Sequence, residues 1–126
     1  MFTHAKPFGG FSVNDVESAK TFYKDTLGLE VSDAPMGQLQ LCIDDDTRIL
    51  VYEKPNHTPA TFTILNFPVK DIDRAVDELT ERGVRFEVYK DGDLKTDAKG
   101  VHREGGPKIA WFKDPSGNYL SVLEAT

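Results

Sequence analysis

The chain has 126 residues, of which 39% are hydrophobic and 29% charged, and its formal net charge at pH 7 is −6. This composition is typical of one folded domain, and the acidic balance argues against nucleic acid or an anionic membrane as the main partner. No apolar run is long enough for a membrane span or a signal peptide, so we expect a cytoplasmic protein. The single cysteine, Cys42, excludes a disulfide within the chain.

The first half of the chain predicts one strand, one helix and three more strands. Residues 8–13 form the first predicted strand, which contains two adjacent glycines. Asp15 is a candidate N-cap, apolar residues recur at helical spacing over 16–27, and Gly28 is placed to end the helix. The three further strands are predicted over residues 29–32, 38–43 and 48–53.

The second half repeats this order. A strand is predicted over residues 61–69, followed by a helix that starts at Asp71 and ends at Gly83. The remaining predicted elements are strands over 84–89, 109–112 and 119–124, a long loop over 90–108 and a turn over 114–118. The whole chain therefore predicts an α+β fold in which a β-α-β-β-β unit occurs twice.

The two halves also match in sequence. The segment from Val13 to Ala19 and the segment from Val69 to Ala75 share the form V-x-D-[VI]-[DE]-x-A. Such an internal duplication is informative because a single unit covers only one face of its sheet with its helix. Two units side by side would form one curved sheet with a concave inner face.

These motifs identify a family resemblance. The F-Y-x-x-x-L-G-L run at 22–29, the D-P-S-G-N run at 114–118 and the duplication resemble the vicinal oxygen chelate superfamily. That superfamily includes glyoxalase I, extradiol dioxygenases, fosfomycin-resistance enzymes and bleomycin-resistance proteins. The resemblance implies one domain over 1–126, with module one at about 6–55 and module two at about 60–125. It further implies an open, U-shaped mixed β-sheet barrel and a homodimer.

The resemblance also implies a metal site, from which this sequence departs. In the metalloenzymes of the superfamily, His or Gln in the first strand and Glu in the last strand of each module hold a divalent cation. The matching positions here are Phe8, Leu50, Ile64 and Ser121. Phe, Leu and Ile offer no lone pair, and a single hydroxyl is a poor substitute for imidazole or carboxylate. We therefore expect no bound metal and no cofactor.

Strand alternation predicts which side chains face the concave groove. The predicted ligand-binding residues are Phe8, Gly10, Ser12, Leu50, Tyr52, Ile64, Asn66 and Ser121, with Trp111 as a further candidate. This is an apolar surface with a few polar groups, which is typical of small-molecule pockets. The alternatives are that these residues fill a partly collapsed groove and that Trp111 packs under the helix.

The leading functional hypothesis is a metal-independent protein that binds a small molecule, such as an antibiotic or a metabolite, and sequesters it. One alternative is a glyoxalase-like lyase or isomerase, or a dioxygenase, with non-standard metal ligands or acid–base chemistry at Tyr52, His102 or Glu53. Another is an interaction module without a ligand. The loop over 90–108 is a candidate lid that carries His102, although a plain surface histidine is the more common case for such a loop.

Overall fold

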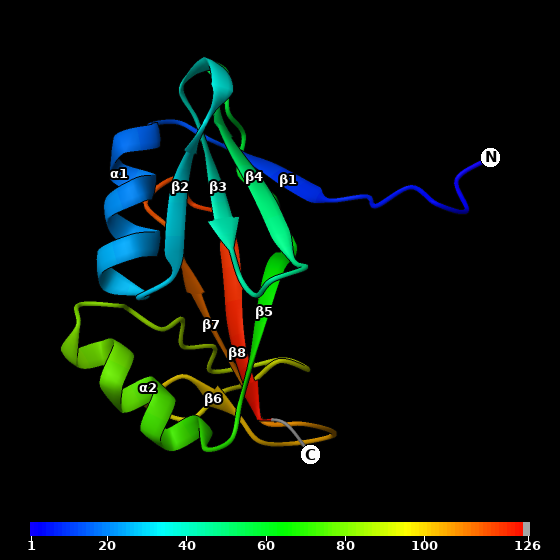
Figure 1. Cartoon of the computed structure of the whole chain (residues 1–126). Helices are drawn as coiled ribbons and strands as arrows, with labels where there is room; N and C mark the ends of the chain where they lie inside the picture. The colour runs from blue at the N-terminus through cyan, green and yellow to red at the C-terminus, as the bar shows by residue number, and fades with distance from the viewer. Residues whose placement is uncertain (125–126) are drawn as a thin grey trace. The chain divides into compact units, whose positions relative to one another are not determined.

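The computed structural model describes residues 1–124 and divides the chain into two compact units. The first unit is Met1–Thr58 and the second begins at Pro59. Each unit contains one four-stranded mixed sheet and one main helix (Figure 1). The predicted end of module two, at residue 125, lies outside the described residues.

The sheet of the first unit has the strand order β1-β4-β3-β2. Strands β1 and β4 are parallel, whereas β3 is antiparallel to both β4 and β2. The elements are β1 (Gly9–Val13), α1 (Val16–Thr21), β2 (Glu30–Ala34), β3 (Gln38–Cys42) and β4 (Arg48–Glu53). The predicted helix over 16–27 is thus present in two parts, since a π-helical turn at Phe22–Thr26 continues α1 toward Gly28, whose φ is 76°.

The sheet of the second unit repeats this topology with the order β5-β8-β7-β6. The elements are β5 (Thr63–Val69), α2 (Ile72–Glu81), β6 (Val101–His102), β7 (Ile109–Lys113) and β8 (Tyr119–Glu124). Strand β5 is parallel to β8, and β7 is antiparallel to both β8 and β6. The predicted duplication of the β-α-β-β-β unit is therefore confirmed.

The repeated aspartate of the V-x-D motif starts each helix. Asp15 is the N-cap of α1 and accepts a hydrogen bond from the Glu17 amide, and Asp71 is the N-cap of α2 and accepts one from the Arg74 amide. An N-cap carboxylate satisfies an amide at the helix start that has no partner within the helix. This local chemistry explains why the two helix starts are predictable from sequence.

Burial alternates along β3 and β7, as strand alternation requires, and each sheet has a set of buried apolar residues that share one face. In the first sheet the buried set includes Val13, Leu41 and Val51, all at 0% exposure, and in the second sheet it includes Ala110 and Leu120 at the same value. Helices α1 and α2 each pack against the sheet of their own unit. The buried sets therefore form the two helix–sheet cores, and the intervening residues lie on the opposite face of each sheet.

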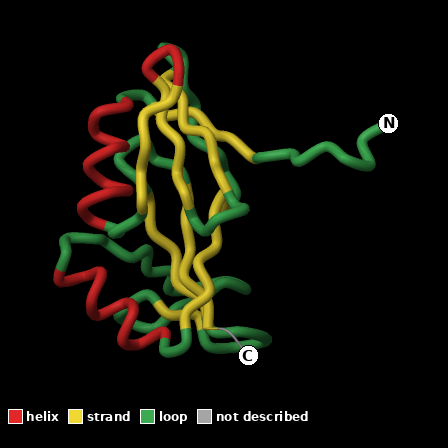
Figure 2. The backbone as a smooth tube through the Cα atoms, in the orientation of Figure 1, coloured by secondary structure: helices red, strands yellow, loops and turns green. Residues whose placement is uncertain are grey.

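The strand predicted over 84–89 is wrong. Within this segment Phe86 alone pairs with β7, through an isolated β-bridge to Phe112. The Glu87 amide also donates a hydrogen bond to the Trp111 carbonyl at 2.8 Å. The chain then leaves the sheet and returns at β6, where Val101 pairs with Ala110 on the same edge of β7. Figure 2 shows this long irregular stretch between α2 and β7, interrupted by the short strand β6. The predicted loop over 90–108 consequently contains the strand that completes the sheet.

The return of this loop depends on Gly100. Its φ is +98°, and a Cβ added there would lie 2.8 Å from the Phe86 Cβ and 2.9 Å from the Glu87 carbonyl oxygen. A residue with a side chain rarely adopts such a positive φ or such close contacts, so glycine is required where the loop returns beside Phe86 and Glu87.

Among residues 1–124, no helix is long and apolar enough to cross a membrane.

Candidate functional site

Four of the predicted ligand-binding residues belong to the face of the first sheet that lies opposite α1. Gly10 pairs with Leu50 and Ser12 with Tyr52 across β1 and β4, so these four side-chain positions are on one face. Phe8 directly precedes β1, and its side chain is 67% exposed. The sheet therefore brings together an aromatic, an aliphatic and two hydroxyl groups.

The two adjacent glycines of β1 differ in the room that surrounds them, and alternation places only Gly10 on this face. A Cβ added to Gly10 would lie 3.3 Å from the Leu50 carbonyl oxygen and 3.6 Å from the Leu50 Cβ. A Cβ added to Gly9 would have no heavy atom within 4 Å. Gly10 therefore lies close to the β4 backbone, whereas the open space next to the glycine pair lies at Gly9, on the side of β1 that also carries Phe11 and Val13.

His57 joins this face, although the sequence offered no reason to place it there. Its Nδ1 lies 2.6 Å from the Ser12 Oγ, across a separation of 45 residues. The His57 amide also donates to the Lys54 carbonyl at 3.0 Å, which fixes the turn that follows β4. The hydrogen-bonded Ser12–His57 pair places a group capable of proton transfer beside Tyr52.

A second polar group lies along β3 and β4 of the same unit. Arg48 Nη1 donates to Gln40 Oε1 at 3.3 Å and lies 3.5 Å from Cys42 Sγ. Gln40 pairs with Leu50 in the sheet, so its side chain lies on the same face as the predicted residues. The sheet thus carries a charged and hydrogen-bonding group, made of Arg48, Gln40 and Cys42, next to its apolar residues.

In the second unit, three predicted residues form one row across the sheet. Asn66 on β5 pairs with Ser121 on β8, and Ser121 pairs with Trp111 on β7. The Ser121 hydroxyl donates to Asn66 Oδ1 at 2.6 Å, and Ser121 is fully buried. Ile64 lies at the register shift between Thr63 and Leu65, where the pairing of β5 with β8 gives it no partner.

Trp111 lies on the face of the sheet opposite the helix-side core. Its neighbours along β7, Ala110 and Phe112, are buried at 0% and 1% exposure, whereas Trp111 is half-buried. The alternative that Trp111 packs under the helix is therefore wrong, because alternation assigns that side to Ala110 and Phe112. Sequence alone left both sides open, since all three residues are apolar.

Two further rings accompany Trp111. The Tyr89 and His102 ring centroids lie 6.0 Å and 6.2 Å from that of Trp111. His102 Nδ1 donates a hydrogen bond to the Lys95 carbonyl at 2.6 Å, which orients the imidazole. The long loop therefore contributes Tyr89, and β6 contributes His102, to an aromatic cluster on this face.

The electrostatic surroundings of the cluster come from Lys113, Glu87 and Tyr119. Lys113 Nζ lies 3.5 Å from Glu87 Oε1 and 5.0 Å from the centre of the Tyr119 ring. The Glu87 carboxylate raises the pKa of the Lys113 ammonium, and the Tyr119 phenol adds to this effect. Burial raises the pKa of the Tyr89 phenol above its usual value, with a further contribution from Tyr119. Both shifts favour the protonated forms, an ammonium at Lys113 and a neutral phenol at Tyr89.

Glu53, which the sequence suggested as an acid–base group, has a structural contact instead. Its Oε1 accepts a hydrogen bond from the Val16 amide at 3.0 Å, at the start of α1. The four positions that the sequence resemblance matched to metal ligands carry three hydrocarbon side chains and one hydroxyl, and that hydroxyl is the buried Ser121 group bonded to Asn66. Within residues 1–124, no three or more His, Cys, Asp or Glu side chains gather as a potential metal-binding group.

The fold and the duplicated motifs agree with the comparisons with known proteins. Residues 4–122 match the sequence profile of the Glyoxalase/Bleomycin resistance protein/Dioxygenase superfamily. The chain therefore belongs to this superfamily, as the sequence resemblance predicted. The predicted fold class is also confirmed, because the neighbouring solved structures share this fold over nearly the whole chain.

Three relatives illustrate the range of the match. The uncharacterized protein YraH of Bacillus subtilis (strain 168) is 28% identical, over 89% of this chain and 91% of that protein. TnmS3, an antibiotic binding protein from Streptomyces sp. CB03234, is 28% identical with a TM-score of 0.68, over 98% of this chain and 99% of that one. A superfamily member from Sphaerobacter thermophilus DSM 20745 is 26% identical with a TM-score of 0.68, over 94% and 97% of the two chains.

Proposed function

We propose that this protein binds a small organic molecule without a metal ion and sequesters it. The observation that carries the proposal is the donor chemistry at Phe8, Leu50, Ile64 and Ser121. Three hydrocarbons and a hydroxyl that is already hydrogen-bonded do not fit a divalent cation, which requires imidazole, carboxylate or several other oxygen ligands. The superfamily's metal-assisted reactions have no route through these side chains.

The same residues suit the binding of an organic molecule. The faces opposite α1 and α2 combine apolar side chains with a few hydrogen-bonding groups, as small-molecule sites do. We propose that Phe8, Gly10, Ser12, Leu50, Tyr52, Ile64, Asn66, Trp111 and Ser121 contact the ligand. The antibiotic binding activity of TnmS3 supports this class of function and makes an antibiotic a reasonable first probe. We also propose that the protein is a cytoplasmic homodimer.

The Ser12–His57 pair supports a second candidate, an enzyme that uses acid–base chemistry in place of a metal. At 2.6 Å from the Ser12 Oγ, the His57 imidazole is within proton-transfer distance of a hydroxyl. The neighbouring Tyr52 phenol supplies a further proton donor on the same face. In this candidate, His57 takes the role that the sequence suggested for Glu53 and His102.

Elemental analysis of the purified protein, with thermal-shift titrations of Zn, Ni, Mn and Fe, tests the metal-independent proposal. A ligand that binds only the folded state raises the unfolding temperature, so we expect no stoichiometric metal and no shift. One bound metal per chain with a clear shift would refute the proposal.

A screen of antibiotics and metabolites, followed by the fluorescence of the single tryptophan, tests the binding site. We expect a bound aromatic antibiotic to change the Trp111 emission, and Ser12→Ala and Asn66→Ala to weaken binding. Met36→Ala, at an exposed position outside the proposed site, serves as the control. Turnover of a probe that His57→Ala abolishes would instead favour the acid–base enzyme.

A further inference from the structure

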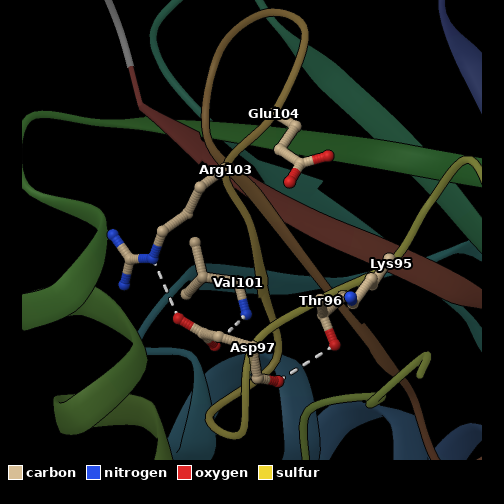
Figure 3. Close-up of a pocket in the computed structure, with 6 residues that line it drawn as sticks. All are labelled: Lys95, Thr96, Asp97, Val101, Arg103 and Glu104. Atoms are coloured by element: carbon tan, nitrogen blue, oxygen red, sulfur yellow. Dashed lines mark hydrogen bonds and ion pairs between the residues drawn. The ribbon is translucent and has the colours of Figure 1, made fainter. Parts of the chain in front are cut away.

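The second unit contains a small open cavity of about 210 Å³ that the proposed binding face does not include. Figure 3 shows the six residues that line it, all from the stretch between residues 95 and 104. Val101 belongs to the helix-side set of the sheet, and Arg103 bonds to Asp73 on α2. His102, between them in sequence, lies beside Trp111 on the other side. The cavity is therefore on the side of β6 that faces α2.

Two of the residues that line the cavity are buried, and a third is held by several hydrogen bonds. Val101 and Thr96 are 1% and 8% exposed. Asp97 Oδ1 accepts hydrogen bonds from the Lys99 and Val101 amides at 3.0 Å and 2.9 Å, and its Oδ2 accepts one from Arg103 Nε at 2.9 Å. These bonds, drawn in part in Figure 3, hold the loop in one conformation around the cavity.

Two of the four charged residues that line the cavity are already neutralised. Arg103 bonds to Asp97 and also to Asp73, whose Oδ1 lies 2.6 Å from Arg103 Nη2. The other two, Lys95 and Glu104, are exposed, and among residues 1–124 their side chains have no hydrogen-bond or ion-pair partner. They do not pair with each other either, although they border the same cavity. The cavity therefore presents one unpaired positive group and one unpaired negative group.

We propose that this cavity binds a small zwitterion of about the size of an amino acid. Its carboxylate would pair with the Lys95 ammonium, and its own ammonium would pair with the Glu104 carboxylate. A ligand with only one charge would be attracted by one of these two side chains and repelled by the other. The small volume suits a small molecule better than a drug-sized ligand, whose pocket occupies roughly 300–1,000 Å³. The site shares no residue with the proposed binding face, so it is tested independently of the proposed function.

Glycine titrations of the ¹⁵N-labelled protein, followed by NMR, test this proposal. We expect saturable shifts of the Thr96 and Val101 amides with glycine. Acetate and methylammonium, each at the same ionic strength, should give no saturable shift at these amides. A linear response without saturation, or an equal response to a single-charge probe, would refute a zwitterion site.

Charge variants assign the two contacts. Lys95→Gln and Glu104→Gln should each weaken glycine binding roughly two- to fivefold, as for an exposed ion pair. The double variant Lys95→Glu/Glu104→Lys should restore binding, because glycine can bind in the reverse orientation. Lys70→Gln and Glu81→Gln are the matched controls, since each removes a charge of the same sign from a residue of this unit that does not line the cavity. Neither should change glycine binding. Unchanged affinity in both Lys95→Gln and Glu104→Gln would overturn the proposal.

Discussion

Glu53 and Glu124 occupy equivalent positions in the two units and make the same contact. Each ends the last strand of its unit, opposite Val13 and Val69, the first residues of the two V-x-D motifs. The Glu53 carboxylate accepts a hydrogen bond from the Val16 amide, and the Glu124 carboxylate accepts one from the Ile72 amide, both at 3.0 Å. In each helix this satisfies the first amide, which the N-cap aspartate does not reach.

Removal of either glutamate should therefore destabilise its own helix start. Glu53→Ala and Glu124→Ala are each expected to lower the free energy of unfolding by about 0.5–2 kcal/mol, the range for loss of a capping side chain. Chemical denaturation followed by circular dichroism measures the change. Glu104→Ala, at an exposed loop position without a side-chain partner in the described chain, is the control. If Glu53→Ala is no less stable than this control, the capping role is wrong.

Gly100 should not tolerate a methyl group. Gly100→Ala combines an unfavourable φ of +98° with a Cβ placed 2.8 Å from the Phe86 Cβ, so we expect a loss of about 1–3 kcal/mol in unfolding free energy. Gly92→Ala is a matched control, since its φ is +92° but an added Cβ has no heavy atom within 4 Å. The difference between the two variants in thermal unfolding isolates the steric contacts with the Phe86 Cβ and the Glu87 carbonyl oxygen. Equal losses would mean that these contacts do not constrain the loop.

The contacts between α2 and the long loop should weaken in acid. Hydrogen bonds from Arg103 and Lys99 lower the pKa of Asp73 to about 2. Because this value lies below the usual value of about 3.9, the stabilisation is complete above pH 4 and is lost as the pH falls from about 4 to 2. Asp73 is 44% exposed, so solvent limits the contribution to less than about 1 kcal/mol.

An NMR titration of the Asp73 carboxyl measures this pKa directly. Arg103→Gln should raise the pKa toward the ordinary range, because the first of its causes is removed. Arg74→Gln is the control, since the Arg74–Glu78 pair lies on the same helix and involves neither Asp73 nor the loop. A pKa that is the same in the wild-type protein and Arg103→Gln would contradict the contact.

The parts of the fold that were predicted correctly depend on local chemistry. The aspartates at 15 and 71 start helices because their carboxylates reach amides two and three residues ahead. Strand β4 was predicted at its observed bounds, Arg48–Glu53, because its apolar and polar residues identify it within a short window. The duplicated motif then extended this local information to the topology of the second unit.

The errors concern contacts between residues that are distant in sequence. The segment over 84–89 has the alternation and composition of a strand, yet the edge of β7 is shared between Phe86 and the segment Val101–His102. The contact between Ser12 and His57 spans 45 residues, so neither residue's immediate neighbours indicate it. Glu53 resembled a candidate acid–base group until its hydrogen bond to the Val16 amide was known.

The sequence by itself determined the superfamily, the duplicated topology and the helix starts. These properties follow from motifs and from periodicity, which are encoded within short stretches of chain. Only the tertiary structure decided that Trp111 lies opposite the helix-side core, that His57 bonds to Ser12 and that Lys95 and Glu104 border one cavity. Such relationships depend on strand register and loop closure, which set side chains from distant positions next to one another.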